Sequence, residues 1–179
     1  MKEIRVLIRR MRNRSEAEIC ARTLETSEPW ITLRRGYKHS IKPLMDRTRE
    51  VYVATEGASI VGFVLLDVRG PFRGYIHLLC IMPEWRNRGI GAKLIQYVER
   101  RVFREHPNVF LCVSSFNRAA QRFYKRMGFK RVGTIPDYIV KGHSEYLMRK
   151  TRGPINGCPG PALGNDRKCE IKGRPTTGN

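Results

Sequence analysis

The stretch RNRGIGAKLIQYVERR, residues 86–101, decides the fold of this chain. An apolar run, IHLLCIM (76–82), comes just before it and is typical of a buried strand. Five apolar residues then recur at helical spacing: Ile90, Leu94, Ile95, Val98 and Val102. This pattern predicts a helix from Gly89 to about residue 105, so a strand passes into a helix with Gly89 and Gly91 at the junction.

The glycines and the basic residues around this junction indicate an anion-binding site. Glycine has no Cβ, so another group can approach the backbone closely. The N–H groups of the first helical turn point outward, and the helix dipole favours an anion there. Arg86, Arg88 and Lys93 add positive potential. We therefore expect a phosphate or pyrophosphate here, with a purely structural turn as the alternative.

The spacing of the two glycines excludes two common phosphate-binding motifs. Leu94 stands where the dinucleotide fingerprint has its third glycine, and no Gly-Lys-Ser/Thr follows as in a Walker loop. A Gly-x-Gly pair alone is a weak signal, so the rest of the chain has to identify the site.

The remaining segments predict a mixed α/β sheet. Ser15 and Glu18 form an apparent capping box, with Ser15 as the N-cap of the first helix. Strands are expected at 4–9, within 50–70 (a hairpin), and at 74–82, 109–113, 129–135 and 144–150, with further helices within 31–48 and over 117–127. This order predicts a single domain, 1–152, with about seven strands and helices on both faces. The Gly/Pro-rich tail, 153–179, is expected to be disordered.

The charge points to anionic partners. The 179 residues carry a formal net charge of +19, of which the tail contributes only a small part. Such a chain attracts nucleic acid, ribosomes, acidic protein surfaces or a phosphorylated cofactor, unless the charge serves only solubility.

The location of the protein is also constrained by its composition. No apolar run approaches the roughly 20 residues of a membrane span, and the N-terminus lacks the apolar region of a signal peptide. The five cysteines are Cys20, Cys80, Cys112, Cys158 and Cys169. Their odd number and spacing predict a cytoplasmic protein with neither a disulfide framework nor a metal site, in which Cys80 and Cys112 are core residues.

Two segments together resemble a known family. Arg86-x-x-Gly89-x-Gly91 is similar to the R/Q-x-x-G-x-G/A motif of the GNAT superfamily of acetyl-CoA-dependent N-acetyltransferases. The segment NRAAQRFYKRMGF, residues 117–129, resembles the family's second signature, N-x-x-A-x-x-F/Y-Y-x-x-x-G-F. The resemblance covers about residues 4–150, and its layout is closest to the branch that acetylates the N-termini of ribosomal proteins.

The resemblance implies a sheet that is splayed between its fourth and fifth strands, with acetyl-CoA in the opening. Backbone groups of residues 80–82 would pair with the pantetheine amides, those of 88–93 would hold the pyrophosphate, and Asn117 would contact the pantetheine arm. The cofactor-binding residues implied are Cys80, Ile81, Met82, Arg86, Arg88, Gly89, Ile90, Gly91, Ala92, Lys93, Asn117 and Tyr124.

The chemistry needs an acid and a base. The resemblance implies that Tyr124 protonates the departing thiolate, and a phenol is suited to this task; the alternative is a core tyrosine. The family's frequent glutamate base is replaced by Tyr75. His77, two residues on, has a pKa suited to a base or a water relay, unless it is a packed histidine. Asp137 with Tyr138, and Glu145, are other candidates.

The resemblance also implies that the acceptor site lies between the loop after the first helix and the last strands. Glu28 would attract an ammonium group and Trp30 would form an apolar wall, with Tyr75 and Tyr138 as further contacts. Glu28 at a helix end and Trp30 as a core anchor are the structural alternatives.

The resemblance implies direct transfer of an acetyl group from acetyl-CoA to a primary amine. The acceptor is expected to be an N-terminus or lysine of a ribosomal or other protein, and the enzyme a monomer or homodimer. A small-molecule amine is the second choice. Weak association with nucleic acid or ribosomes would follow from the charge, and two non-catalytic readings remain: a nucleic-acid-binding module and a CoA sensor.

Overall fold

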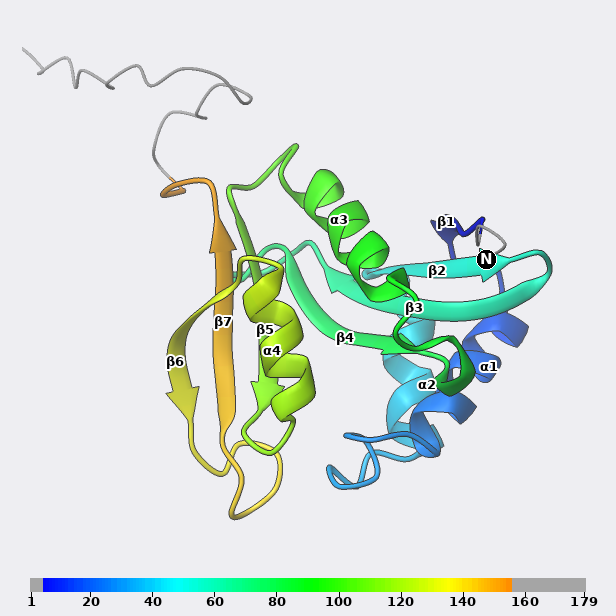
Figure 1. Cartoon of the computed structure of the whole chain (residues 1–179), viewed down its shortest axis with the longest axis horizontal. Helices are drawn as coiled ribbons and strands as arrows, with labels where there is room; N and C mark the ends of the chain where they lie inside the picture. Colours follow the sequence, from blue (N-terminus) through cyan, green and yellow to red (C-terminus); the bar gives the residue numbers. More distant parts are fainter. Residues whose placement is uncertain (1–4, 156–179) are drawn as a thin grey trace, which may run out of the picture.

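Residues 5–155, the part of the chain that the structure describes, form a seven-stranded sheet in the order β1-β2-β3-β4-β5-β7-β6 (Figure 1). The structure is a computed structural model. The strands are β1 (Leu7–Arg10), β2 (Glu50–Glu56), β3 (Ser59–Asp67), β4 (Tyr75–Ile81), β5 (Asn108–Ser114), β6 (Lys130–Ile135) and β7 (Glu145–Thr151). The helices are α1 (Arg14–Glu25), α2 (Tyr37–Met45), α3 (Ile90–Val102) and α4 (Arg118–Arg126), with a 3-10 turn, η1 (Pro83–Trp85).

Helices cover both faces of the sheet, as predicted. The central strands alternate, so that each supplies apolar side chains to both faces. Val64 and Leu66 of β3 pack on the side of α3 and α4, whereas Phe63 and Leu65 pack on the side of α1 and α2. Only the β4–β5 pair is parallel among the described neighbours. The expected mixed α/β fold is confirmed. The domain boundary at 152 stays a prediction, because most of the tail lies outside the described residues.

The start of α1 differs from the sequence prediction. The N-cap is Asn13, whose side chain accepts a hydrogen bond from the Glu16 backbone N–H at 3.1 Å. Glu16 in turn accepts from the Arg12 backbone N–H at 2.8 Å and from the Arg9 guanidinium at 2.7 Å. Ser15 lies inside the first turn and is not the N-cap. The capping interactions therefore sit two residues earlier than expected, with Glu16 reaching back to the Arg12 N–H, and Arg9 of the preceding strand adds a partner.

Ion pairs hold the C-terminal half of α3 to the sheet. Arg101 Nη2 lies 2.9 Å from Oε1 of Glu50 on β2, and Tyr52 donates to the other carboxylate oxygen at 2.7 Å. Lys150 Nζ of β7 lies 2.7 Å from Oε1 of Glu99. These partly buried contacts fix the axis of α3, and its N-terminal end then faces the gap between β4 and α4 (Figure 1).

Candidate active site

The sheet opens between β4 and β5. These strands are paired only at Tyr75–Phe110 and Ile76–Leu111. Beyond those pairs β4 continues beside β3, and β5 continues beside β7, each to its end. The facing edges of β4 and β5 therefore present backbone N–H and C=O groups without a strand partner. The splay expected from the family resemblance is confirmed in this form.

A β-bulge reorients β4 at the opening. Leu65 of β3 opposes Leu78, whereas Leu66 opposes Ile76, so His77 is an extra residue on β4. Ile76 consequently packs on the α3 side and Leu78 on the α1 side. The bulge explains why Ile76 and Leu78, two residues apart, point to opposite faces.

The N-terminal end of α3 forms an anion-binding cradle. Gly89 is the N-cap, with φ of +76°, a backbone conformation that favours glycine. Lys93 donates the first intrahelical N–H bond, to the Gly89 carbonyl at 3.1 Å, so the preceding N–H groups point out of the helix. The first turn carries no acidic residue. The Arg88 guanidinium stacks 4.9 Å from the Trp85 ring, and Arg86 Nε donates to the Ile81 carbonyl at 3.2 Å.

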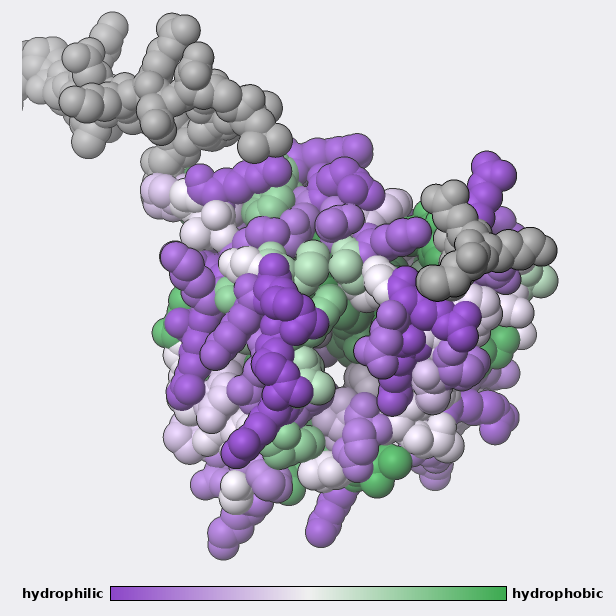
Figure 2. Space-filling model, viewed as in Figure 1, coloured by the Kyte–Doolittle hydropathy of each residue, from purple (hydrophilic) through white to green (hydrophobic). Residues whose placement is uncertain are grey.

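A cavity of about 540 Å³ occupies the opening. It is walled by the α1–α2 loop, the β3–β4 loop, β4, β5, α4 and the β6–β7 segment. Figure 2 shows a hollow over β4, between α4 and the N-terminal end of α3, with apolar side chains at its base and hydrophilic side chains on both sides. The side chains that matter most for chemistry in the lining are Trp30, Arg35, Asp67, Arg69, Tyr75, His77, Cys112, Ser114, Asn117, Tyr124, Tyr138 and Glu145.

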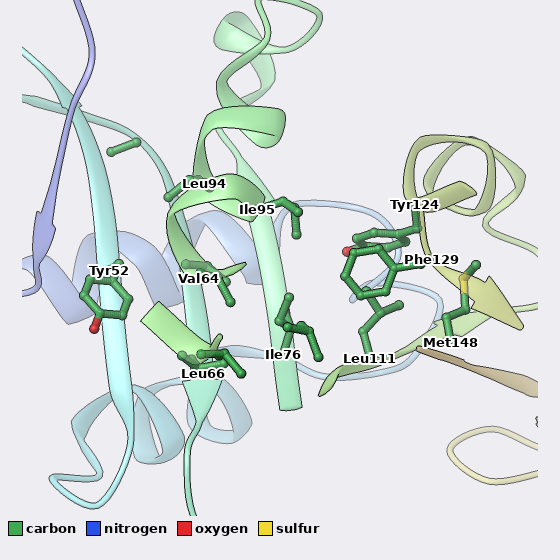
Figure 3. Close-up of a cluster of buried hydrophobic side chains, with 14 of the residues drawn as sticks. Tyr52, Val64, Leu66, Ile76, Leu94, Ile95, Leu111, Tyr124, Phe129 and Met148 are labelled. Atoms are coloured by element: carbon green, nitrogen blue, oxygen red, sulfur yellow. The ribbon is translucent and has the colours of Figure 1, made fainter. Parts of the chain in front are cut away.

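Tyr124 reaches this cavity from α4. Its ring packs against Phe123 and Phe129, with centroid distances of 5.2 and 5.9 Å. Figure 3 shows its hydroxyl pointing away from α4, toward the β4 side of the opening. Burial alone raises the pKa of this phenol, which therefore stays protonated at neutral pH. A protonated hydroxyl at a cavity can donate its proton to a ligand that binds there.

Asn117 is fixed as the N-cap of α4. Its Oδ1 accepts a hydrogen bond from the Ala120 backbone N–H at 3.1 Å. The residue also lines the cavity, so its amide N–H₂ is the group left to contact a ligand. The cap thus orients the amide and helps to place Tyr124, two turns further along the same helix.

His77 and Tyr75 stand together on the β4 side. Their rings meet edge to face, with centroids 4.8 Å apart. His77 Nε2 lies 3.4 Å from Asp67 Oδ2, and Arg49 approaches the same carboxylate at 3.9 Å. Burial, followed by the charge of Arg49, lowers the pKa of His77 despite Asp67, so the imidazole is neutral at pH 7. Burial, followed by the Cys112 thiol, raises the pKa of Tyr75, which stays protonated.

Glu145 is a buried carboxylate at the same cavity. It is 3% exposed, and Ser114 Oγ donates a 2.5 Å hydrogen bond to its Oε1. Burial raises the pKa of Glu145, while the Ser114 hydrogen bond and the charge of Arg35 oppose this rise. The site thus holds a buried acid–base group besides His77.

Comparison with known proteins decides the family. The sequence profile of the acetyltransferase (GNAT) family matches residues 13–129. This protein belongs to the GNAT family. Over 104 residues it is 34% identical to the N-alpha-acetyltransferase RimI of Mycobacterium tuberculosis, covering 56% of this chain and 65% of that protein. Over 126 residues it is 25% identical to an N-alpha-acetyltransferase of Sulfurisphaera tokodaii, covering 63% of this chain and 75% of that protein. The first of these matches spans just under two thirds of the relative's length.

Solved structures agree on the fold of this GNAT protein. A structure of the GNAT family from Desulfovibrio desulfuricans superposes with a TM-score of 0.71 at 18% identity, covering 82% of this chain and 99% of that one. The ribosomal-protein-S18-alanine N-acetyltransferase of Escherichia coli gives 0.67 at 14%, covering 85% and 98%. An aminoglycoside 6'-N-acetyltransferase complexed with coenzyme A gives 0.68 at 18%, covering 83% and 98%.

The structure of this GNAT domain gathers some predicted site residues and separates others. Seven line the cavity described above: Trp30, Tyr75, His77, Asn117, Tyr124, Tyr138 and Glu145. The expected cofactor residues of 80–82 and 86–93 lie outside that lining, along β4, η1 and the start of α3. The Cys80 side chain packs in the cluster beneath α1, so only its backbone faces the opening. Glu28 is exposed outside the lining, where it accepts from the Thr32 N–H at 3.4 Å.

Several cavity residues were missed or misjudged from sequence. Cys112 is half-buried and lines the cavity, so its prediction as a core residue is wrong. The reason is that β5 is no longer paired with β4 beyond Leu111, so Cys112 borders the opening. Arg35 and Arg69 come from loops and Asp67 is the last residue of β3, and no sequence motif marks any of the three. Glu145 was named only among several alternatives, although a glutamate at the start of an apolar strand was a usable signal.

No helix within residues 5–155 is long and apolar enough to cross a membrane. The same part of the chain contains no group of three or more His, Cys, Asp or Glu side chains arranged to hold a metal ion.

Proposed function

We propose that this protein is an acetyl-CoA-dependent N-acetyltransferase that transfers the acetyl group directly to a primary amine. One observation carries the proposal. The protonated hydroxyl of Tyr124 points into a cavity at the split between β4 and β5, and the anion cradle at the start of α3 adjoins α4, the helix that carries Tyr124, at Gly91 and Phe123. A thioester held across the split would place its sulfur near this hydroxyl.

Acetyl-CoA fits the residues along this opening. The N–H groups of Ile90, Gly91 and Ala92, with Arg88 and Lys93 beside them, suit a pyrophosphate. A Cβ at Gly91 would lie 3.3 Å from Phe123 Cζ, so the glycine keeps the groove between α3 and α4 open. The unpaired edge of β4 offers N–H and C=O groups to the pantetheine amides.

The chain's own residues supply the transfer chemistry. The β4 edge and Asn117 hold the pantetheine arm in place, which turns the reaction into an intramolecular one. Tyr124 donates its proton to the sulfur as the carbon–sulfur bond breaks. Trp30 and Tyr138 wall the side on which the amine arrives.

The acceptor we propose is the N-terminus of a protein, with a ribosomal protein as the favoured class. The names of the RimI and archaeal relatives support an N-terminal amine. The acceptor side opens between two loops, and Tyr138 there is 61% exposed, which suits an extended peptide that runs out to solvent. A small-molecule amine is the second choice, and the volume of the cavity, about 540 Å³, supports it.

The basic surface supports an acceptor in nucleic-acid-rich surroundings in the cytoplasm. Six Lys and Arg residues and no Asp or Glu occur between Asn117 and Ile135. Four of them lie exposed along α4 at i, i+4, i+7 and i+8: Arg118, Arg122, Lys125 and Arg126. Within the described chain none of these four forms an ion pair with a carboxylate. We call this the α4 basic stripe, and we propose that it contacts ribosomal RNA.

The test is an acetyl-CoA consumption assay with three matched acceptor sets. Peptides with a free N-terminus are compared with the same peptides blocked at the N-terminus but containing lysine, and with polyamines and aminoglycosides. We expect turnover with free N-termini and far less with the other two sets. Turnover with the polyamines or aminoglycosides alone would contradict the protein acceptor and support a small-molecule amine instead. No turnover with any amine, at acetyl-CoA concentrations that saturate binding, would contradict the proposed enzyme.

A further inference from the structure

Glu145 is held in place from one side only. It is the first residue of β7, directly opposite Ser114 in the β5–β7 register. The Ser114 hydroxyl, itself buried, occupies Oε1 at 2.5 Å. Oε2 has no hydrogen-bond partner among the described residues and is not shut off from the cavity that Glu145 lines. Burying a carboxylate with a free oxygen is costly unless a positive group meets it.

The groups facing Glu145 leave room for such a positive group. Burial, with a smaller contribution from the charge of Glu145, raises the pKa of Tyr75 of β4 and of Cys112 of β5, so both are neutral at pH 7. Tyr138 lines the cavity from the β6–β7 segment. Arg35 of the α1–α2 loop is the one charge that acts on Glu145 in this part of the chain, and it is exposed without a hydrogen bond to the carboxylate.

We propose that Glu145 receives the ammonium group of the acceptor and accepts its proton before the nitrogen attacks. This inference rests on the proposed function. The cavity lies within the same opening as Tyr124, so one carboxylate and one phenol flank the place where amine and thioester must meet. Glu145 then acts as the general base and Tyr124 as the general acid.

The protons and bonds balance with these two groups. The acceptor enters as R–NH₃⁺ and gives one proton to the Glu145 carboxylate, which later releases it to solvent. The amine nitrogen forms its bond to the thioester carbon, and the carbon–sulfur bond breaks. Tyr124 protonates the departing sulfur, and the second proton lost by the nitrogen restores the phenol. The products are the acetylated amine, CoA thiol and one proton.

The other two acid–base groups at the cavity are less suited to this step. Asp67 is shared between His77 and Arg49. The imidazole of His77 is neutral, so it offers no charge to draw an ammonium into a cavity whose mouth carries Arg35 and Arg69. Glu145 is the carboxylate here whose second oxygen is free, and it combines attraction with basicity.

The experiment measures kcat/KM for a free N-terminal peptide between pH 6 and 9.5. The variants are Glu145→Gln, Glu145→Asp, His77→Gln and, as a matched carboxylate control, Glu105→Gln, whose exposed side chain pairs with Arg101 on the far end of α3. Acetyl-CoA affinity is measured for each variant by calorimetry, which reports whether the fold and the cofactor groove are intact.

We expect Glu145→Gln to lower kcat/KM by about 10²–10⁴-fold near pH 6.5. The deficit should shrink as the pH passes the pKa of about 8 of a peptide amine, because free amine then needs no base. Glu145→Asp should keep the wild-type dependence on pH at a lower rate, and Glu105→Gln should match the wild type. Acetyl-CoA affinity should stay within about threefold throughout.

Two results would overturn the assignment. One is a Glu145→Gln rate within about threefold of wild type, and the other is a deficit that stays constant with pH while His77→Gln shows the pH-dependent loss. A wild-type enzyme that binds acetyl-CoA but acetylates no amine would instead refute the proposed function, and the role of Glu145 with it. If only the role of Glu145 is wrong, the wild-type enzyme still acetylates the peptide. The wild-type turnover therefore distinguishes the two outcomes.

Discussion

Gly91 and Phe123 meet where the first turn of α3 passes α4, and a Cβ on Gly91 would lie 3.3 Å from Cζ of the phenylalanine. That distance is tighter than ordinary van der Waals contact, so the two helices approach as closely as they do because residue 91 has no side chain. Each residue belongs to one of the two sequence motifs that resemble the GNAT family. The motifs therefore meet in space, on the two sides of the groove proposed for acetyl-CoA.

We expect Gly91→Leu to weaken acetyl-CoA binding by at least about tenfold, which corresponds to about 1.4 kcal/mol. The new side chain points toward α4 and fills the groove. It also crowds Phe123, so the melting temperature should fall. The double variant Gly91→Leu/Phe123→Ala gives the leucine space, and we expect it to recover stability but not affinity. Calorimetric titration with acetyl-CoA that showed wild-type affinity in the double variant would contradict the location of the groove.

Tyr124→Phe tests the proton donor. The ring and its contacts with Phe123 and Phe129 remain, and only the hydroxyl is removed. We expect kcat to fall by about 10²–10⁴-fold, the usual contribution of general acid catalysis. Acetyl-CoA affinity should hardly change, because the hydroxyl acts as charge develops on sulfur.

The control for Tyr124 is a second removal of an aromatic hydroxyl. Tyr97→Phe, on α3, takes a hydroxyl from a tyrosine that packs edge to face on Tyr52, 4.8 Å away, outside the cavity. Its kcat should equal that of the wild type. If kcat of Tyr124→Phe also holds within a few-fold while chemistry limits the rate, water or another residue protonates the thiolate.

The sequence predicted the fold where periodicity and glycine placement agree. The helical spacing after Gly89 predicts a helix, and the apolar run before it favours a strand because it is short and Pro83 follows it, so the β4–α3 unit was predictable. The start of α1 was not. Asn13 and Ser15 are both good N-caps, and each is followed three residues later by a glutamate. The ion pair between Arg9 and Glu16 favours Asn13 as the N-cap, and no local sequence pattern reveals that ion pair.

Only the residues of the candidate site that belong to a sequence motif were predictable. Tyr124 and Asn117 belong to the second motif, and both line the cavity. The bulge at His77 could not be foreseen, because an extra residue in an apolar strand leaves no mark in the sequence. Cys112 was misjudged for a related reason, since its apolar run gives no sign that β5 parts from β4. Residues whose role depends on where two strands separate require the structure.

Glu145→Gln should stabilise the fold at neutral pH. The pKa of Glu145 is raised in the folded state by burial, so folding is favoured by its protonation. For a raised pKa, stability is fully present below the unfolded value and is lost as the pH rises through the folded value. Glutamine removes that loss while still accepting the Ser114 hydrogen bond.

Thermal unfolding of wild type and Glu145→Gln at two pH values measures this effect. We expect the variant to melt higher at pH 8, by about 2–4 °C for each kcal/mol gained, and the two proteins to coincide near pH 4. The same variant is expected to lose activity, so stability and catalysis would oppose each other at this residue. A melting temperature that falls at pH 8 would show that the ionised carboxylate is stabilised by a group other than Ser114.

The α4 basic stripe makes a separate prediction about ribosomes. Arg122→Glu/Arg126→Glu reverses two charges one turn apart on its exposed face. The matched control, Lys38→Glu/Lys42→Glu, makes the same change at the same spacing on α2, which covers the opposite face of the sheet. If the stripe binds ribosomal RNA, the first variant should bind purified ribosomes at least about tenfold more weakly, whereas the control should change little. The slope of log K against log salt should also decrease in magnitude, by about 0.7 to 0.9 for each phosphate that the protein no longer neutralises.

Co-sedimentation between 50 and 200 mM salt measures both the affinity for ribosomes and its salt dependence. Acetyl-CoA affinity, measured in parallel, separates weaker RNA binding from weaker binding of the cofactor phosphates. Equal weakening by the two variants would mean that net charge alone, and not the stripe, draws the protein to polyanions.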